Sequence, residues 1–168
     1  MSTLRIAGIV PESITDGPGF RYAVFTQGCP HRCPGCHNPE TWSKEGGKLM
    51  DVKELFEDYS SRSRVRGLTL SGGEPFEQAA ASADLAKLVQ ASGGDVLVYT
   101  GYLLETLQSK ASTDPAIASL LEASDYLIDG PFVLSERDLS LQFRGSRNQK
   151  LYRKVDNEWK PWELTDWN

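Results

Sequence analysis

The sequence predicts an α/β protein, built as a partial (open) β/α barrel of about five to six parallel strands. Three observations lead to this prediction. Segments with the apolar pattern of strands alternate with segments of helical spacing, as in consecutive βα units. The strand segments are too apolar to have a face in water, which is typical of buried parallel sheets. A complete eight-unit barrel needs about 250 residues, whereas this chain has 168.

The first half of the chain supplies two strands, a turn and a helix. Strands are expected over residues 4–10 and 21–27. Between them, Asp16-Gly17-Pro18-Gly19 reads as a tight turn, because proline presets one central position and glycine accepts positive φ. Arg21 after this turn is either solvated or close to the opening of an active site. Asp51 is placed to cap a helix, whose apolar residues at helical spacing are Val52, Leu55, Phe56 and Tyr59.

The second half repeats the alternation. Further strands are expected over residues 67–71, 95–100 and 125–129, and helices over residues 79–90, 103–108 and 115–123. No linker or internal repeat divides the chain, so one domain is expected. Its last segment, residues 154–168, is polar but carries Trp159, Trp162 and Trp167.

Composition excludes several classes of protein. Hydrophobic residues make up 39% and charged residues 24%, as in ordinary globular chains. No apolar run approaches the roughly 20 residues that span a bilayer, and the first ten residues do not resemble a secretory signal. The net charge of −5 disfavours general nucleic-acid binding. We therefore expect a cytoplasmic protein that binds neither membrane nor nucleic acid.

The three cysteines of the chain, Cys29, Cys33 and Cys36, lie within eight residues in the spacing C-x3-C-x2-C. An odd number cannot pair completely as disulfides, so the cluster indicates a metal or redox site. Zinc usually takes four protein ligands, and a cramped site of the three cysteines with His37 is one alternative. A [4Fe–4S] cluster bound by three thiolates is the other, and it leaves one iron open for a small molecule.

The cysteine loop and its surroundings resemble the glycyl-radical-enzyme activases of the radical S-adenosylmethionine superfamily, and among them the family that activates anaerobic ribonucleoside-triphosphate reductases. The matching segments are Asp16-Gly17-Pro18-Gly19, Gln27-Gly28-Cys29, Cys33-Pro34-Gly35-Cys36-His37-Asn38, Thr41-Trp42, Leu70-Ser71-Gly72-Gly73-Glu74-Pro75, Tyr99-Thr100-Gly101-Tyr102, Leu127-Ile128-Asp129-Gly130-Pro131-Phe132 and Arg144-Gly145-Ser146-Arg147-Asn148-Gln149. The resemblance implies a radical S-adenosylmethionine type of barrel, with an activase domain over residues 1–154 and a C-terminal tail over residues 155–168.

The resemblance also implies the cofactors and their ligands. Cys29, Cys33 and Cys36 would hold a [4Fe–4S] cluster, and S-adenosyl-L-methionine would close its fourth iron. Reductive cleavage would then give a 5′-deoxyadenosyl radical, which takes hydrogen from a glycine of the reductase large subunit. The cofactors carry this chemistry, so no side chain is assigned a catalytic role, and reduced flavodoxin or a similar donor would supply the electron. The implied cofactor contacts are Gly35, Cys36, His37, Gly72, Gly73 and Glu74.

Several of these assignments have an alternative. A Gly-Gly-Glu segment alone is usually a turn, and only its position one βα unit after the cysteines favours a cofactor site. His37 either contacts the cofactor or braces the loop, and Gly35 stands where many superfamily members place an aromatic residue against the adenine. Residues 144–149 are either a generic polar loop or a part of the cofactor or partner surface. The whole chain could instead activate another glycyl radical enzyme, of the formate lyase type, or be a non-enzymatic metal-binding module.

Overall fold

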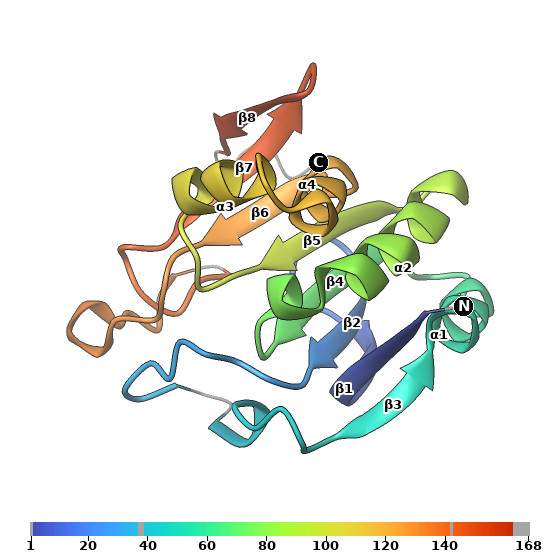
Figure 1. Ribbon diagram of the computed structural model, residues 1–168, viewed down its shortest axis with the longest axis horizontal. Coiled ribbons are helices and arrows are strands. Elements are labelled where there is room, and N and C mark those ends of the chain that lie inside the picture. Colours follow the sequence, from blue (N-terminus) through green and yellow to red (C-terminus); the bar gives the residue numbers. More distant parts are fainter. Residues whose placement is uncertain (1, 37–38, 142, 163–168) are drawn as a thin grey trace.

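The chain is organised around one mixed sheet (Figure 1). The structure is a computed structural model that describes residues 2–36, 39–141 and 143–162. The strands of these residues are β1 (Thr3–Ser13), β2 (Arg21–Thr26), β3 (Lys48–Asp51), β4 (Gly67–Gly72), β5 (Asp95–Tyr99), β6 (Tyr126–Asp129), β7 (Lys150–Val155) and β8 (Glu158–Pro161). The α-helices are α1 (Val52–Ser60), α2 (Ala79–Ala91), α3 (Leu104–Ala111) and α4 (Pro115–Glu122). The strand order is β3-β1-β2-β4-β5-β6-β7-β8.

The prediction of a partial barrel of parallel strands is wrong. Only the central strands β2, β4, β5 and β6 are parallel neighbours, whereas the pairings of β1 with β2 and β3, and of β7 with β6 and β8, are antiparallel. Short connections explain two of these antiparallel pairings, β1 with β2 and β7 with β8. Residues 14–20 between β1 and β2 are too few for a parallel crossover. Between β7 and β8, Asp156 and Asn157 have φ of 52° and 64°, which is the geometry of a two-residue hairpin turn.

The helices α1 to α4 lie on one face of the sheet (Figure 1). The parallel strands follow one another in spatial order, and connections of one hand place successive helices on the same side. Their apolar residues bury one continuous core against the strands, with Tyr22, Val24, Leu68, Leu70 and Val98 on the sheet side. The opposite face carries a smaller buried cluster of Leu97, Ile128, Leu151 and Trp162.

The four helices confirm the helical segments expected from the sequence. Their caps differ from expectation in one case. Asp51 occupies the N-cap position of α1, as predicted, but its side chain makes no capping hydrogen bond. Asp114 does cap α4, because its carboxylate accepts from the backbone N–H groups of Ala116 (3.0 Å) and Ile117 (3.4 Å). The boundary predicted after residue 154 falls within β7, and the hairpin of β7 and β8 extends the sheet beyond it.

Arg21 lies at the amino-terminal edge of the parallel strands, opposite the cysteine loop that follows β2. Its side chain is 0% exposed and donates to Thr69 Oγ1 (3.1 Å) and to the carbonyl oxygen of Leu68 (2.7 Å). A third bond joins its guanidinium to the carboxylate of Asp95. Arg21 is therefore neither solvated nor close to the cysteine loop, and it ties β2 to β4 and β5 from within the protein.

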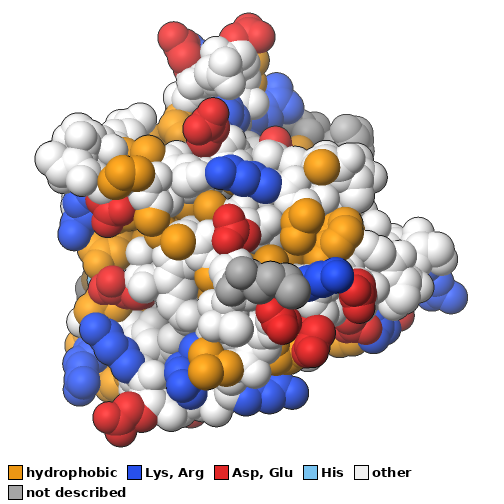
Figure 2. All heavy atoms as spheres, turned by 45° about the vertical axis from the view of Figure 1, so that its right-hand side comes forward, with side chains coloured by type: hydrophobic (Ala, Val, Ile, Leu, Met, Phe, Trp, Pro, Cys, Tyr) orange, Lys and Arg blue, Asp and Glu red, His pale blue; other side chains and the backbone are white. Residues whose placement is uncertain are grey.

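The surface carries both signs of charge. On the face shown in Figure 2, acidic and basic side chains are interspersed and do not gather into one basic patch. This distribution agrees with the net charge of −5. None of the helices in the described ranges has the length and apolar character that crossing a membrane requires.

A hydrogen bond between β2 and α1 predicts that the stability of the fold depends on pH. The Tyr22 hydroxyl donates to Asp58 Oδ2 (2.6 Å), and this bond is the main cause that lowers the pKa of Asp58. The bond therefore contributes stability above the ordinary aspartate pKa of about 3.9, and this contribution is lost as the pH falls through the lower folded-state pKa. Because Asp58 is 40% exposed, we expect Tyr22→Phe to lower the free energy of unfolding by no more than about 1 kcal/mol at pH 7.

Urea denaturation of the two proteins at a series of pH values checks this expectation. The difference between them should shrink as the pH approaches 3, since both lose the ionised acceptor. Tyr152→Phe, which leaves Asp58 untouched, serves as the control and should show no such trend. A Tyr22→Phe difference that stays constant with pH would mean that lost packing, and not the bond to Asp58, causes it.

Candidate cluster and cofactor site

The loops at the carboxyl ends of the parallel strands enclose a cleft of about 230 Å³. Ligands of parallel α/β sheets usually bind at this edge. The cysteine loop follows β2, the Gly-Gly-Glu segment follows β4, and further walls come from the loops after β5 and β6. The cleft is lined by Cys29, His31, Cys33, Cys36, Ser71, Gly72, Gly73, Tyr99, Thr100, Gly101, Gly130, Phe132, Gly145 and Gln149.

All three cysteines line this cleft, as the sequence predicts for a common site. Backbone bonds hold the start of their loop, since Gly28 N donates to Thr41 O (2.6 Å) and Cys29 N donates to Trp42 O (3.1 Å). A turn closes its end, with Cys36 N donating to Cys33 O (3.0 Å). Burial raises the pKa of the Cys29 and Cys33 thiols. Bound metal reverses that preference, because a coordinating thiol is deprotonated.

The donor set fits an iron–sulfur cluster. Three thiols meet in one cleft, and in a cubane each thiolate binds a different iron, so the sulfur atoms need not converge on one point. Within residues 2–36, 39–141 and 143–162, no three His, Cys, Asp or Glu side chains converge in the way that a single metal ion requires. His37, proposed as a fourth zinc ligand or a cofactor contact, lies outside the described residues.

The glycines that the sequence singled out have distinct surroundings. Gly73 lies in the cleft, and a Cβ added there would come within 2.5 Å of the carbonyl oxygen of Gly28. Because Gly73 has no side chain, the backbone at the end of β4 can pack directly against Gly28, the residue before Cys29. Gly72 lines the cleft beside it. Gly35 has a φ of 76°, and a Cβ there would lie 2.8 Å from Leu134 Cδ1, so the cysteine loop packs against the segment after β6.

Glu74 stands behind the cleft wall and is 0% exposed. Its Oε1 accepts from Gly101 N (2.7 Å) and Thr100 Oγ1 (2.9 Å), and Oε2 accepts from Phe76 N (3.1 Å). His31 Nε2 lies 2.6 Å from Oε1. The carboxylate predicted as a cofactor contact is thus surrounded by donors from the protein itself.

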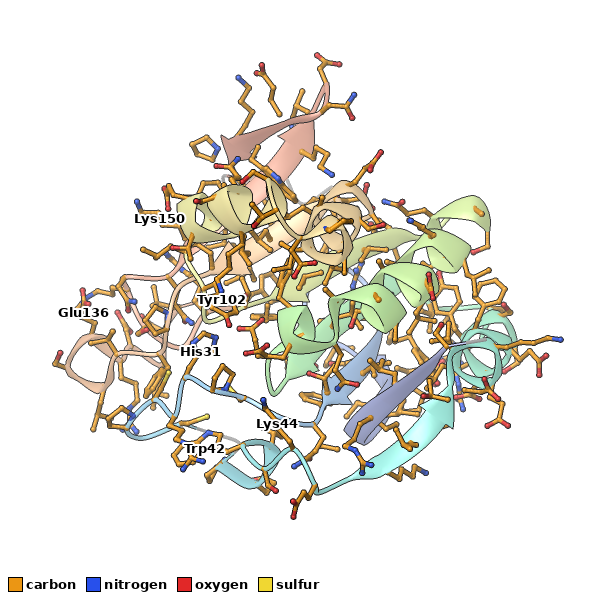
Figure 3. The ribbon with its side chains drawn as sticks, in the orientation of Figure 1. His31, Trp42, Lys44, Tyr102, Glu136 and Lys150 are labelled. Carbon is orange, nitrogen blue, oxygen red and sulfur yellow. The ribbon has the colours of Figure 1, made fainter. Side chains whose placement is uncertain are left out.

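His31 is a site residue that the sequence argument did not assign. It lines the cleft, pairs with Glu74, and its ring lies 4.6 Å from the ring of Tyr102 in an edge-on arrangement. Figure 3 shows His31 and Tyr102 next to each other, contributed by different loops. The available signal was its place between Cys29 and Cys33, but its partner Glu74 is 43 residues away.

The segment of residues 144–149 forms another wall of the cleft. Gln149 holds it in place, because its Oε1 accepts from Gly145 N (2.9 Å) and its Nε2 donates to Gly130 O (3.0 Å). Arg144 Nη1 donates to the carbonyl oxygen of Gln149 (2.8 Å). Of these residues, Gly145, Gln149 and Gly130 line the cleft.

Comparison with known proteins adds two findings. A family described as a 4Fe-4S single cluster domain matches residues 15–152. Several curated relatives are named anaerobic ribonucleoside-triphosphate reductase-activating protein. The chain is 38% identical to that of Vibrio cholerae over 152 residues, which cover 85% of this chain and 94% of the relative. Identity is 36% over 151 residues to that of Escherichia coli K12 (84% and 94% covered) and 34% over 161 residues to that of Enterobacteria phage T4 (90% and 96% covered).

Proposed function

This chain belongs to the family of anaerobic ribonucleoside-triphosphate reductase-activating proteins, and we propose that it generates the glycyl radical of such a reductase. The observation that carries the proposal is the single cleft lined by Cys29, Cys33 and Cys36 together with the glycine segments after β4 and β5. The chain has no fourth cysteine. Cys29, Cys33 and Cys36 would hold a [4Fe–4S] cluster and leave one iron without a protein ligand, and that open position would accept S-adenosyl-L-methionine.

The chain is an enzyme whose cofactors carry the chemistry, while its residues place them. With both cofactors bound, the cluster would supply one electron to S-adenosyl-L-methionine, and the products would be methionine and a 5′-deoxyadenosyl radical able to take a hydrogen atom from a glycine Cα of the partner. Gly72 and Gly73 offer backbone groups to the amino end of S-adenosyl-L-methionine. Gly35 and Cys36 of the cysteine loop would contact the adenine, and His37, which lies outside the described residues, keeps its sequence-based assignment to the same role. The walls of the cleft exclude water from the reactive radical.

The proposed reaction needs two partners, a protein substrate and an electron donor. The substrate is the large subunit of an anaerobic ribonucleoside-triphosphate reductase, whose glycine-bearing segment enters the cleft. The electron comes from an outside donor, reduced flavodoxin or a similar one-electron carrier. All three cysteines lie in the one loop, so the chain has no thiolates for a second cluster that would relay electrons.

The test uses anaerobic protein with a reconstituted cluster, dithionite or reduced flavodoxin, and S-adenosyl-L-methionine. Mixed with the anaerobic reductase of its own organism, it should produce 5′-deoxyadenosine, a glycine-centred doublet in the electron paramagnetic resonance spectrum, and nucleotide reduction. Formate lyase is the control partner and should give no doublet. A doublet on formate lyase alone would overturn the partner, and absence of 5′-deoxyadenosine under all conditions would overturn the reaction.

A further inference from the structure

We propose that Glu74 and His31 form a latch, which fixes the position of the cysteine loop over β4 and β5 without either side chain serving as a cluster ligand. The proposal rests on the proposed function, because it concerns how the cluster is placed relative to the cofactor cleft. It changes the role expected of Glu74 from a cofactor contact to a positioning residue.

The carboxylate of Glu74 is saturated by the protein. Its two oxygens accept hydrogen bonds from Thr100 Oγ1 and from the backbone N–H groups of Gly101 and Phe76, at 2.7–3.1 Å. These donors come from the loops after β4 and β5, so the carboxylate is anchored to the sheet. A fully buried carboxylate surrounded by donors is held in one position. It does not line the cleft, which Gly72 and Gly73 do.

Two contacts of Glu74 cross to the cysteine loop: its backbone N–H donates to Gly28 O (2.8 Å), and its carboxylate meets His31. His31 Nε2 lies 2.6 Å from Glu74 Oε1, and the histidine side chain is only 16% exposed. Oε1 also accepts from the N–H group of Gly101, so it is the acceptor here and the imidazole Nε2 is the donor. Cys29 lies two residues before His31 and Cys33 two residues after it. This one bond therefore connects the middle of the ligand loop to the anchored carboxylate.

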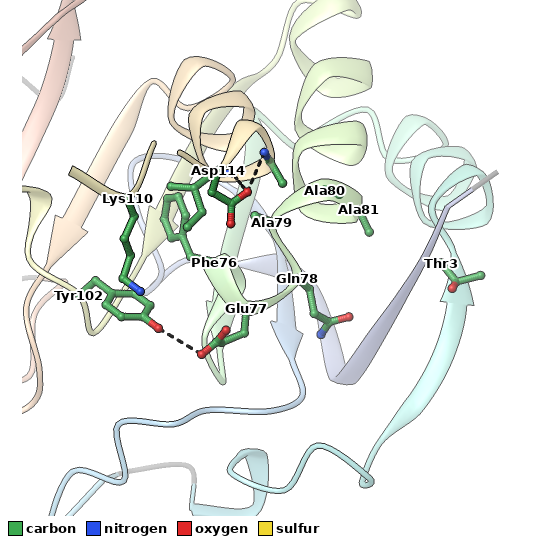
Figure 4. A pocket seen from close by; sticks show the side chains of 12 residues that line it. Thr3, Phe76, Glu77, Gln78, Ala79, Ala80, Ala81, Tyr102, Lys110 and Asp114 are labelled. Carbon is green, nitrogen blue, oxygen red and sulfur yellow. Dashed lines mark hydrogen bonds between the residues drawn. The ribbon is translucent and has the colours of Figure 1, made fainter. Parts of the chain in front are cut away.

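The histidine ring is also enclosed by the loop after β5. A Cβ added to Gly101 would come within 2.4 Å of the His31 ring, so only glycine leaves room for it. The Tyr102 ring packs edge-on against the histidine ring. Tyr102 is itself fixed, since its hydroxyl bonds Glu77 (3.1 Å) and Lys110 Nζ lies 5.0 Å from its ring centroid (Figure 4).

The latch affects the position of the cluster in the cleft but not the ability of the loop to bind it. All three thiols belong to one loop, so their mutual spacing, and with it the ability to bind a cluster, is set within that loop. The position of that loop over Gly72 and Gly73 depends on contacts outside it, and the His31–Glu74 bond is one of them. Loss of the latch should therefore displace an assembled cluster, and a displacement of about 1 Å can lower a rate about 100-fold.

Three variants test the latch in the full-length anaerobic protein. His31→Leu removes the donor, and Glu74→Gln places an amide among groups that need an acceptor. Both should keep the iron content of the wild type but cleave S-adenosyl-L-methionine about 100-fold more slowly. His31→Gln should restore most of the rate, because the glutamine amide nitrogen stands as many bonds from Cβ as Nε2 does.

A measurement on the cluster-free protein gives a second readout that does not depend on activity. Amide hydrogen exchange of Gly28 and Cys29 should be about tenfold faster in His31→Leu and Glu74→Gln than in the wild type, because the loop is released from a charged acceptor. Glu54→Gln is the matched control. It makes the same change at an exposed side chain in the first turn of α1, outside the cleft, and should change neither readout.

The outcomes are distinct. Unchanged exchange and cleavage in His31→Leu and Glu74→Gln would overturn the latch. Loss of iron from these variants to the level of a cysteine variant would also overturn it, because the pair would then be needed to build the cluster and not to place it. If the wild type itself yields no 5′-deoxyadenosine, the proposed function fails, whereas the exchange measurement still decides whether the latch exists.

Discussion

Replacing any one of Cys29, Cys33 or Cys36 by alanine is expected to abolish the catalytic cluster and reduce S-adenosyl-L-methionine cleavage to background. The chain has only these three cysteines, so no other thiol can replace the missing ligand. Two thiolates leave two irons of the cube without protein ligands, where three thiolates leave one. The wild type reconstituted under anaerobic conditions should hold about four irons and four sulfides per chain, and each variant far fewer.

Iron and sulfide analysis together with detection of 5′-deoxyadenosine provides the measurement. Pro34→Ala changes an exposed residue between two of the cysteines and should leave both readouts close to those of the wild type. An alanine variant that still assembles four irons and cleaves the cofactor would remove that cysteine from the ligand set. Stoichiometric zinc in place of iron in the wild type would contradict the cluster itself.

Arg21→Met should strongly destabilise the protein. Arg21 lies at the amino-terminal ends of the parallel strands, away from the cysteine loop. The guanidinium is fully buried and bonds Asp95, Thr69 and the carbonyl of Leu68. Methionine fills much of the volume but leaves the carboxylate and the carbonyl without their donors. Breaking such a buried pair costs about 3–5 kcal/mol, and we expect about 3 kcal/mol because Arg66 still bonds Asp95.

In a chain of this size, about 3 kcal/mol corresponds to a fall in Tm of about 6–12 °C. Thermal unfolding of the reduced, cluster-free protein measures it. Arg64→Met, at an exposed position of the neighbouring segment, is the matched control and should shift Tm by less than about 2 °C. A shift for Arg21→Met no larger than that of the control would show that its hydrogen bonds contribute little net stability.

The sequence predicted the parts of the fold that have a hydrophobic pattern. The apolar runs of β2, β4, β5 and β6 and the four helices lie where they were expected, and these strands are parallel. The strands β3, β7 and β8 were missed because they are short segments in which charged and apolar residues are mixed, Lys48–Asp51, Lys150–Val155 and Glu158–Pro161. The orientation of β1 was wrong because an apolar run looks alike in both directions, and only its short connection to β2 distinguishes them.

The candidate site was predictable to the extent that its residues are neighbours in the sequence. The spacing of the three cysteines predicted one common site, and in the structure all three line one cleft together with Gly72 and Gly73. The pairing of His31 with Glu74 depends on the packing of two loops across 43 residues, which no local pattern reports. The burial of Arg21 was missed for the same reason, since its partner Asp95 is 74 residues away.

The confinement of the thiols to eight consecutive residues has a consequence for how the protein is supplied with iron. Closing a loop this short restricts few residues, so the entropic cost of gathering the ligands is small. No strand or helix contributes a thiol, and the sheet is held by its own core and by Arg21. We therefore expect the surrounding protein to stay folded when the cluster is lost. The same polypeptide should then accept a new cluster without first unfolding, which ligands spread over several elements would not allow.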